Sequence, residues 1–173
     1  MPTPTRSRRP VSLRTRGAVA CAVLLLATGC SSTPPEIDGP DLPAAQDAAC
    51  RALVAALPDT LVGEKAVEVT GATAYGAAWG DPAIVLTCGV VAVDISDVPQ
   101  CVEADGIGWL VSDEDAEGDR DATFTADGYR PRVRLEVPED YLPEQGASAL
   151  AELAAPLKQH LKKTVSCLSV SDF

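Results

Sequence analysis

Two side chains in this sequence are of the types that serve as general acids or bases in hydrolysis. Asp81 lies in the stretch WGDP, and His160 is the one histidine of the chain. Such a group activates water or a nucleophile only when a second group positions it. An aspartate between Gly and Pro also opens turns, and His160 lies between Lys158 and Lys162, as on the exposed flank of a helix. We therefore expect a turn and an ordinary histidine, with a hydrolase that uses Asp81 or His160 as the alternative.

An acidic stretch, DEDAEGDRDATF from Asp113 to Phe124, has part of the spacing of a calcium-binding loop. Counted from Asp113, carboxylates fall at positions one, three, five and nine and a glycine at position six. Position twelve, where such a loop needs a bidentate glutamate, is Phe124, and Arg120 adds a positive charge. The stretch is more typical of a solvated loop between two strands, and we expect neither a metal nor a cofactor.

Three aromatic side chains could line a ligand pocket: Tyr75, Trp79 and Trp109. Aromatic residues make up only 4% of the chain, and in such a chain large rings more often anchor the hydrophobic core. A binding function predicts a concave apolar patch near Trp79 or Trp109.

The first 29 residues have the organisation of a signal peptide. Met1 to Gly17 contains five arginines and no acidic residue, and the apolar run that follows, residues 18–28, is too short to span a bilayer. Thr28 and Gly29 directly before Cys30 resemble the lipobox of bacterial lipoproteins, although Ala27 stands where that box usually has leucine. Cys30 would then be diacylated and become the first residue of the mature protein, and two acyl chains anchor a protein stably. An ordinary secretory signal is the alternative.

Removal of residues 1–29 would leave 144 residues, enough for one compact domain. The signal carries 5 of the 14 basic residues, so 9 remain against 25 acidic ones, a formal charge of −16. A surface of that sign disfavours nucleic acid and is repelled by anionic headgroups. The expected partners are therefore the membrane, through the lipid on Cys30, and an envelope protein or small ligand.

Four cysteines remain after Cys21 leaves with the signal and Cys30 is acylated: Cys50, Cys88, Cys101 and Cys167. An even number in an exported chain predicts two disulfides, since that compartment is oxidising. Of the three possible pairings, we favour Cys88 with Cys101, across two predicted strands, and Cys50 with Cys167, on the first and last predicted helices. A single histidine and the absence of C-x-x-C disfavour a zinc site.

The elements that would position these residues form one α+β domain over residues 43–173, after a flexible tether over residues 30–42. A first helix is predicted from residue 43 to Pro58, with Asp41 as its N-cap. A last helix over residues 144–168 is broken or kinked by Pro156. Apolar and β-branched segments predict strands near residues 67–70, 73–79, 83–91, 101–104, 107–111, 122–126 and 131–137, with a hairpin turn at Asp105-Gly106. We expect an antiparallel sheet of about five to six strands, covered on one face by the N- and C-terminal helices.

Several of these segments resemble one known family. The stretch AWGDPAIVLTCGV, with CRALVAALPDTL before it and CVEADGIGWLV and YRPRVRLEVP after it, is similar to actinobacterial exported lipoproteins that carry a domain of unknown function. The resemblance spans about Asp47 to Val137, and the C-terminal helix matches more loosely. It implies an envelope location and a structural role for Cys50, Cys88 and Cys101, and it supplies no catalytic residue.

The sequence as a whole predicts an exported protein, anchored by lipid on Cys30 to the outer face of the cytoplasmic membrane. It contains no nucleophile elbow, zinc-protease motif or phosphate-binding loop. We expect a binding or interaction module of the cell envelope, with an envelope hydrolase as the alternative.

Overall fold

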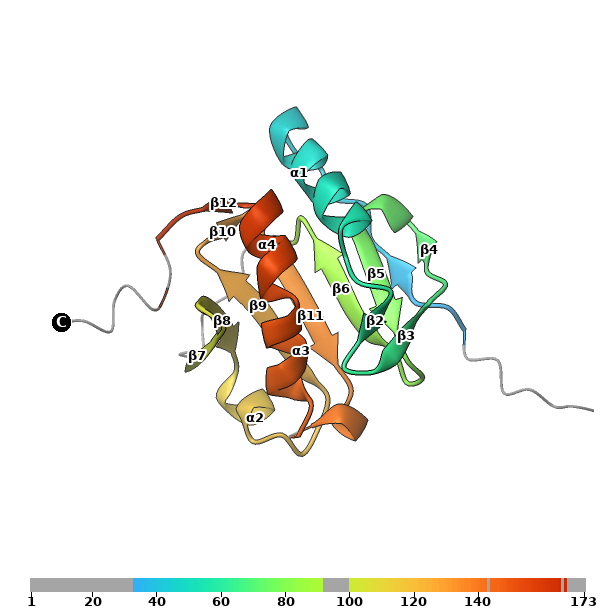
Figure 1. The fold of residues 1–173 in the computed structure, drawn as a ribbon, viewed down its shortest axis with the longest axis vertical. Coiled ribbons are helices and arrows are strands. Elements are labelled where there is room, and N and C mark those ends of the chain that lie inside the picture. The colour runs from blue at the N-terminus through green and yellow to red at the C-terminus, as the bar shows by residue number, and fades with distance from the viewer. Residues whose placement is uncertain (1–32, 92–99, 143, 166, 168–173) are drawn as a thin grey trace, which may run out of the picture. The chain divides into compact units, whose positions relative to one another are not determined.

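The computed structural model describes residues 33–91, 100–142, 144–165 and 167 (Figure 1). The predicted signal peptide and Cys30 lie outside these residues. The helices are α1 (Ala44–Ala55), α2 (Asp113–Ala116), α3 (Gly146–Glu152) and α4 (Ala154–His160), with 3-10 turns η1 (Thr73–Tyr75) and η2 (Glu139–Tyr141). The strands are β1 (Glu36–Ile37), β2 (Thr60–Leu61), β3 (Glu64–Val67), β4 (Thr70–Gly71), β5 (Gly76–Trp79), β6 (Ile84–Cys88), β7 (Gln100–Ala104), β8 (Ile107–Val111), β9 (Ala122–Asp127), β10 (Tyr129–Arg130), β11 (Val133–Val137) and β12 (Lys162–Lys163).

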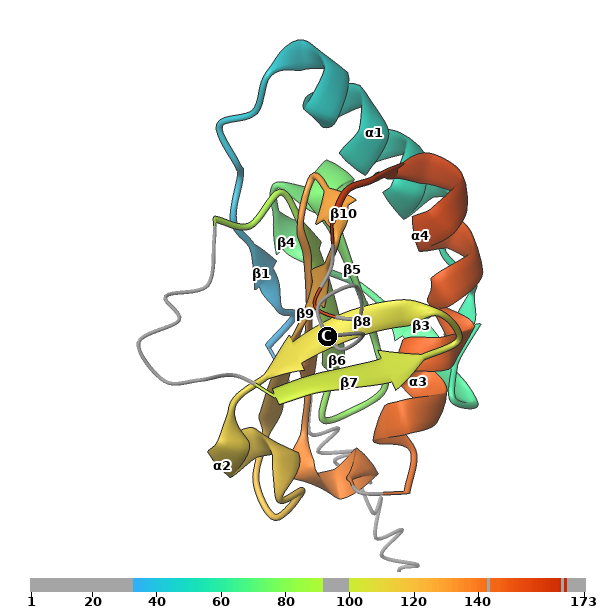
Figure 2. The ribbon, with the colours of Figure 1, turned by 90° about the vertical axis from the view of Figure 1, so that its left-hand side faces the viewer.

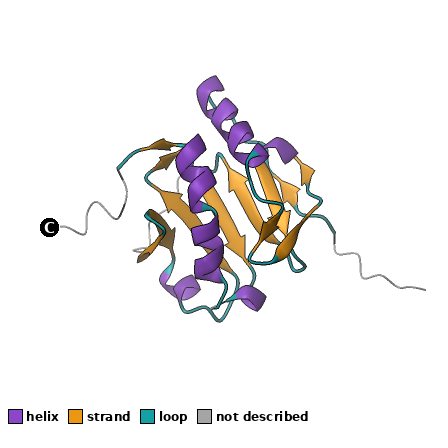
Figure 3. Ribbon diagram, in the orientation of Figure 1, coloured by secondary structure: helices purple, strands orange, loops and turns teal. Residues whose placement is uncertain are grey.

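Eight of these strands form one antiparallel sheet in the order β2-β3-β5-β6-β11-β9-β8-β7. Figure 3 shows the strands in orange behind the helices in purple. At its centre Leu135 of β11 lies opposite Leu86 of β6 and Phe124 of β9. The predicted hairpin is confirmed, because Asp105 and Gly106 join β7 to β8 with φ of 44° and 72°, as a two-residue turn requires. The antiparallel α+β prediction is confirmed too, although the sheet has eight strands because short β2 and β3 extend one edge.

Helices α1, α3 and α4 cover one face of the sheet (Figure 1). Trp79, Leu86 and Leu135 point from the strands into the layer below Leu53 of α1 and Leu157 of α4, and all five side chains are fully buried. Each buried leucine contributes about 1.5–3 kcal/mol relative to an exposed one. This layer is the main core, and none of α1, α3 and α4 lies on the opposite face of the sheet, here called the outer face.

The two predicted helices form with altered ends. Asp41 makes no capping hydrogen bond, so that prediction is wrong: α1 begins after Pro43, whose fixed φ suits the start of a helix. The predicted break at Pro156 is confirmed, because α3 and α4 meet at Leu153 and Pro156 lies in the first turn of α4, where a missing N–H is tolerated. α4 ends at His160 rather than near residue 168, and the chain continues as β12, which pairs with β10.

Residues 33–42 lie against the outer face of the sheet, on the side away from the helices (Figure 2). β1 pairs in parallel with β4, and Ile37 is only 2% exposed. A Cβ at Gly76 would lie 2.7 Å from Ile37 Cδ1, so the absence of a side chain lets the segment approach. The prediction of a flexible tether over residues 30–42 is therefore wrong for residues 33–42. The segment has the proline-rich composition of a linker, but its Ile37 packs against the sheet at Gly76.

Two disulfides form, as predicted, but the favoured pairing of Cys88 with Cys101 and of Cys50 with Cys167 is wrong. Cys50 of α1 bonds to Cys88 at the end of β6, and Cys101 of β7 bonds to Cys167. Strands β11, β9 and β8 separate β6 from β7, which places those two strands four spacings, about 19 Å, apart. That distance is far beyond the reach of a disulfide. Cys88 instead points toward the helix layer, where it meets Cys50.

Candidate functional site

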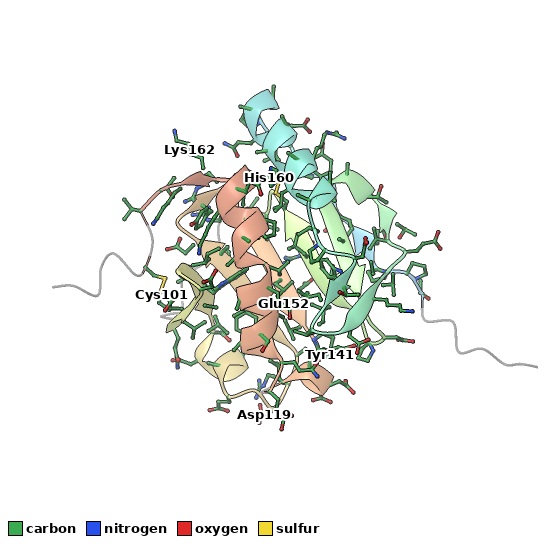
Figure 4. The ribbon with its side chains drawn as sticks, in the orientation of Figure 1. Cys101, Asp119, Tyr141, Glu152, His160 and Lys162 are labelled. Atoms are coloured by element: carbon green, nitrogen blue, oxygen red, sulfur yellow. A yellow bond between two sulfur atoms is a disulfide. The ribbon has the colours of Figure 1, made fainter. Side chains whose placement is uncertain are left out.

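The two candidate acid-base residues do not share a cleft. Asp81 is exposed in the turn between β5 and β6, and the Tyr141 hydroxyl donates to the Pro82 carbonyl at 2.8 Å. The turn therefore lies beside Tyr141, whose pKa is raised chiefly by burial. His160 lies at the other end of the α3-α4 pair from Tyr141 (Figure 4). The structure thus does not assemble the pair of groups that the hydrolase alternative needs.

The acidic stretch from Asp113 to Phe124 is organised by local hydrogen bonds. The sequence predicts a solvated loop between two strands, and the beginning of this loop forms the short helix α2. Ser112 Oγ caps α2 by accepting the Asp115 N–H at 3.0 Å. Asp115 Oδ2 in turn accepts the Thr123 N–H at 3.1 Å. Within the described residues, no three histidine, cysteine or acidic side chains gather closely enough to hold a metal ion.

The three aromatic candidates lie in two different environments. Trp79 and Trp109 are fully buried, and the Trp79 indole donates to the Pro58 carbonyl at 2.9 Å. The Trp109 Nε1 is buried without a hydrogen-bond partner among the described residues. Tyr75 is partly exposed, at the edge of the contact with α1. Both tryptophans therefore occupy core positions, and neither lines the two cavities described below.

Tyr75 belongs to a polar cluster that joins η1 to α1. Its hydroxyl donates to Asp47 Oδ1 and accepts a hydrogen bond from Arg51 at 2.7 Å, while the Arg51 guanidinium lies 4.9 Å from the ring centroid. The hydrogen bond from Tyr75, followed by that from Arg51, lowers the pKa of Asp47. The bond to Asp47 in turn raises the pKa of Tyr75. Both carboxylate oxygens of Asp47, the Tyr75 hydroxyl and two of the three Arg51 nitrogens bond within the cluster, which indicates a tie between two elements.

A cavity of about 380 Å³ opens on the outer face of the sheet. Its walls are residues 38–41 of the N-terminal segment and residues 87–91 at the end of β6, and Arg134 of β11 completes it. We call it the outer-face cavity. Its volume falls within the range typical of small-ligand sites, near the lower end.

Arg134 holds a central position on the outer face. In the sheet it lies directly between Thr87 of β6 and Thr125 of β9, both of which are buried. Its Nε lies 3.5 Å from Glu136 Oε1, within the range of an ion pair. This nitrogen atom is buried and has no hydrogen bond. The guanidinium therefore has an ion pair with Glu136 but no hydrogen bond to a described residue, and the side chain is 37% exposed, so its terminal nitrogens can still donate to a ligand.

The N-terminal wall of the outer-face cavity is held against the sheet. Gly89 has φ of +91°, and a Cβ built on it would lie 2.8 Å from Pro40 Cγ and 2.9 Å from Leu42 Cδ1. Only glycine suits both that backbone conformation and that contact. Asp38 and Asp41 are carried by this wall, are exposed, and make no hydrogen bond or ion pair with the described residues. The fold thus places two carboxylates and a guanidinium around one cavity.

A second, smaller cavity of about 230 Å³ lies farther along β11. It is lined by residues 121–123 and 136–138 together with Ala83, and its charged groups are the carboxylates of Asp121 and Glu136. Asp121 Oδ1 already accepts the Glu139 N–H at 2.9 Å. No lysine or arginine lines this cavity, so it offers a ligand fewer kinds of charged group than the outer-face cavity does.

Sequence reasoning missed the outer-face cavity. The alternation of charged and apolar residues in β11 does place Arg134 on the face opposite Val133 and Leu135, as expected. Asp38 and Asp41, however, lay in the predicted tether, and no local pattern indicates that this stretch returns to the sheet. The one available signal was Ile37, an isolated large apolar residue among prolines and acids.

A family model described as "Protein of unknown function (DUF3515)" matches residues 11–165. Neither the curated proteins nor the solved structures contain a match to this chain. Among the described residues, no helix is both long and apolar enough to cross a membrane.

Proposed function

The chain belongs to the DUF3515 family of proteins of unknown function, and we propose that it is a lipid-anchored binding module of the cell envelope. Membership confirms the expected relation to a family with a domain of unknown function, and it assigns no activity. The proposal places the protein on the outer face of the cytoplasmic membrane, with the outer-face cavity as its binding site.

Two features support export and anchoring. Signal-like residues 1–29 end directly before Cys30, and two disulfides are typical of proteins that fold in an oxidising compartment. Thr33, the first described residue, follows Cys30 by three positions, so a fully extended chain between them spans about 10 Å. A lipid on Cys30 would therefore hold the side of the domain that carries residues 33–42 close to the membrane surface.

The observation that carries the binding function is the outer-face cavity with Arg134 in its lining, because this guanidinium is ion-paired with Glu136 but has no hydrogen bond to a described residue. A guanidinium whose donors lack partners is costly on a partly buried surface unless water or a ligand satisfies them. The hydrolase alternative has no comparable support, because Asp81 and His160 lie at different ends of the domain.

Mass spectrometry of the native N-terminal peptide tests the anchor. We expect a diacylated Cys30 as the first residue, and a Cys30→Ala variant that is released from the membrane or remains unprocessed. Cys21→Ala is the matched control, since Cys21 lies inside the predicted signal and should not affect acylation. An unmodified Cys30 in the native protein would refute anchoring.

NMR of the purified mature protein tests binding. Small molecules extracted from the cell envelope should shift the amide signals of Thr87 and Gly89, which line the cavity. The shifts should disappear in Arg134→Gln and persist in Arg120→Gln, a control cation on the exposed loop after α2. If the extract leaves the cavity signals unmoved, the binding function is refuted.

A further inference from the structure

The charges around the outer-face cavity are arranged for a ligand that carries both signs. Arg134 supplies one positive group, and Asp38 and Asp41 supply two negative groups from the opposite wall. Arg134 is ion-paired with Glu136 at 3.5 Å, on the side of a second cavity, and it forms no ion pair with Asp38 or Asp41. Opposite charges that border one cavity without meeting leave a space between them that a third group can fill.

Each charged group matches a different ligand group. The guanidinium is a planar fork that binds a carboxylate through two parallel hydrogen bonds. The two aspartates accept hydrogen bonds and carry no donor when ionised, so they match an ammonium group. Thr87 adds a hydroxyl next to Arg134 that can donate or accept.

The balance of charge excludes ligands of a single sign. A simple anion would meet Arg134 but would be repelled by two aspartates and by a mature chain with 9 basic and 25 acidic residues, a formal charge of −16. A simple cation would meet the aspartates but be repelled by the guanidinium, whose terminal nitrogens would gain no hydrogen bond from it. A zwitterion satisfies both sets of groups at once.

We propose that the outer-face cavity binds a small zwitterion, an amino acid or short peptide, with its carboxylate on Arg134 and its ammonium on Asp38 and Asp41. The cavity volume of about 380 Å³ suits a ligand of that size. Because Gly89 has no side chain, Pro40 and Leu42 pack closely against it, and this contact positions the wall that carries the two aspartates. This inference rests on the proposed binding function and specifies its ligand class.

Calorimetric titration of the purified mature protein with three related probes tests the ligand class. L-alanyl-L-alanine carries both charges, N-acetyl-L-alanine only the carboxylate, and L-alanine amide only the ammonium. We expect the dipeptide to bind and each single-charge probe to bind about tenfold more weakly or worse. Equal affinity for either single-charge probe overturns the proposal, as does the absence of heat from the dipeptide at about 10 mM.

Charge-neutral variants locate the site. Arg134→Gln and the double variant Asp38→Asn/Asp41→Asn should each weaken dipeptide binding about tenfold. Arg120→Gln and Asp119→Asn, on the exposed loop after α2, are matched controls that should leave the affinity unchanged. Dipeptide binding that survives in both cavity variants overturns the proposal.

The two proposals fail in different ways. If envelope extract shifts the cavity signals while the dipeptide does not bind, the zwitterion assignment is overturned and the binding function stands. If neither the extract nor the dipeptide acts on the cavity, both are overturned.

Discussion

Replacing Cys50 and Cys88 together with alanine should lower the free energy of unfolding by about 4 kcal/mol. The bridge closes a loop with a sequence separation of 38 residues. The chain-entropy relation, in which the unfolded chain loses freedom with the logarithm of loop length, gives about 3.9 kcal/mol at 25 °C for that loop. Both cysteines are fully buried, so their truncation to alanine adds a small packing loss to that value.

Guanidinium-induced unfolding measures this change. A single domain typically has about 5–15 kcal/mol of stability, so the double variant should remain folded with a much lower unfolding midpoint. Its m-value should rise, because the unfolded chain without the bridge exposes more surface. A loss below about 1 kcal/mol would show that this bridge contributes little, contrary to the loop-length reasoning.

Free-thiol counts under denaturing conditions test the pairing itself. In the proposed mature protein, which lacks Cys21 and carries lipid on Cys30, Cys50→Ala/Cys88→Ala should contain no free thiol, since Cys101 and Cys167 remain bonded. Cys50→Ala/Cys167→Ala removes one partner from each bridge and should contain two free thiols, because Cys88 and Cys101 lie on strands four spacings apart. A disulfide between Cys88 and Cys101 in that variant would refute the strand order.

Three other changes probe the N-terminal segment and the cluster of Tyr75. Ile37→Ala should cost about 2–5 kcal/mol in denaturant unfolding, as for a core residue and unlike a tether residue. Gly89→Ala should cost more than about 1 kcal/mol, because it combines a positive φ with a clash against Pro40, and a stability equal to wild type would contradict that contact. Tyr75→Phe should raise the pKa of Asp47, measured by carboxyl NMR, toward its usual value. Because the folded pKa of Asp47 is depressed, its stabilisation is present above the unfolded pKa and is lost as pH falls through the folded pKa. The stability difference between wild type and Tyr75→Phe should therefore shrink in acid, and a constant difference would contradict the pKa argument.

Local patterns located most elements of the domain. The alternation in β11, the Asp105-Gly106 turn and the position of Pro156 each depend on neighbouring residues, and the structure confirms all three. The helix ends were less predictable, because the start of α1 and the end of α4 depend on where the chain must turn next. The number of cysteines similarly predicted two disulfides, since an even count in an oxidising compartment leaves few alternatives.

Contacts between distant parts of the chain were decided by the tertiary structure alone. The disulfide pairing follows from the strand order, which places β11, β9 and β8 between Cys88 and Cys101. The outer-face cavity exists because Ile37 packs at Gly76 and Pro40 at Gly89, bringing Asp38 and Asp41 to the face that carries Arg134. Periodicity reports which face of its own element a side chain occupies. Which distant segment covers that face depends on packing across the whole domain, and no local pattern carries that information.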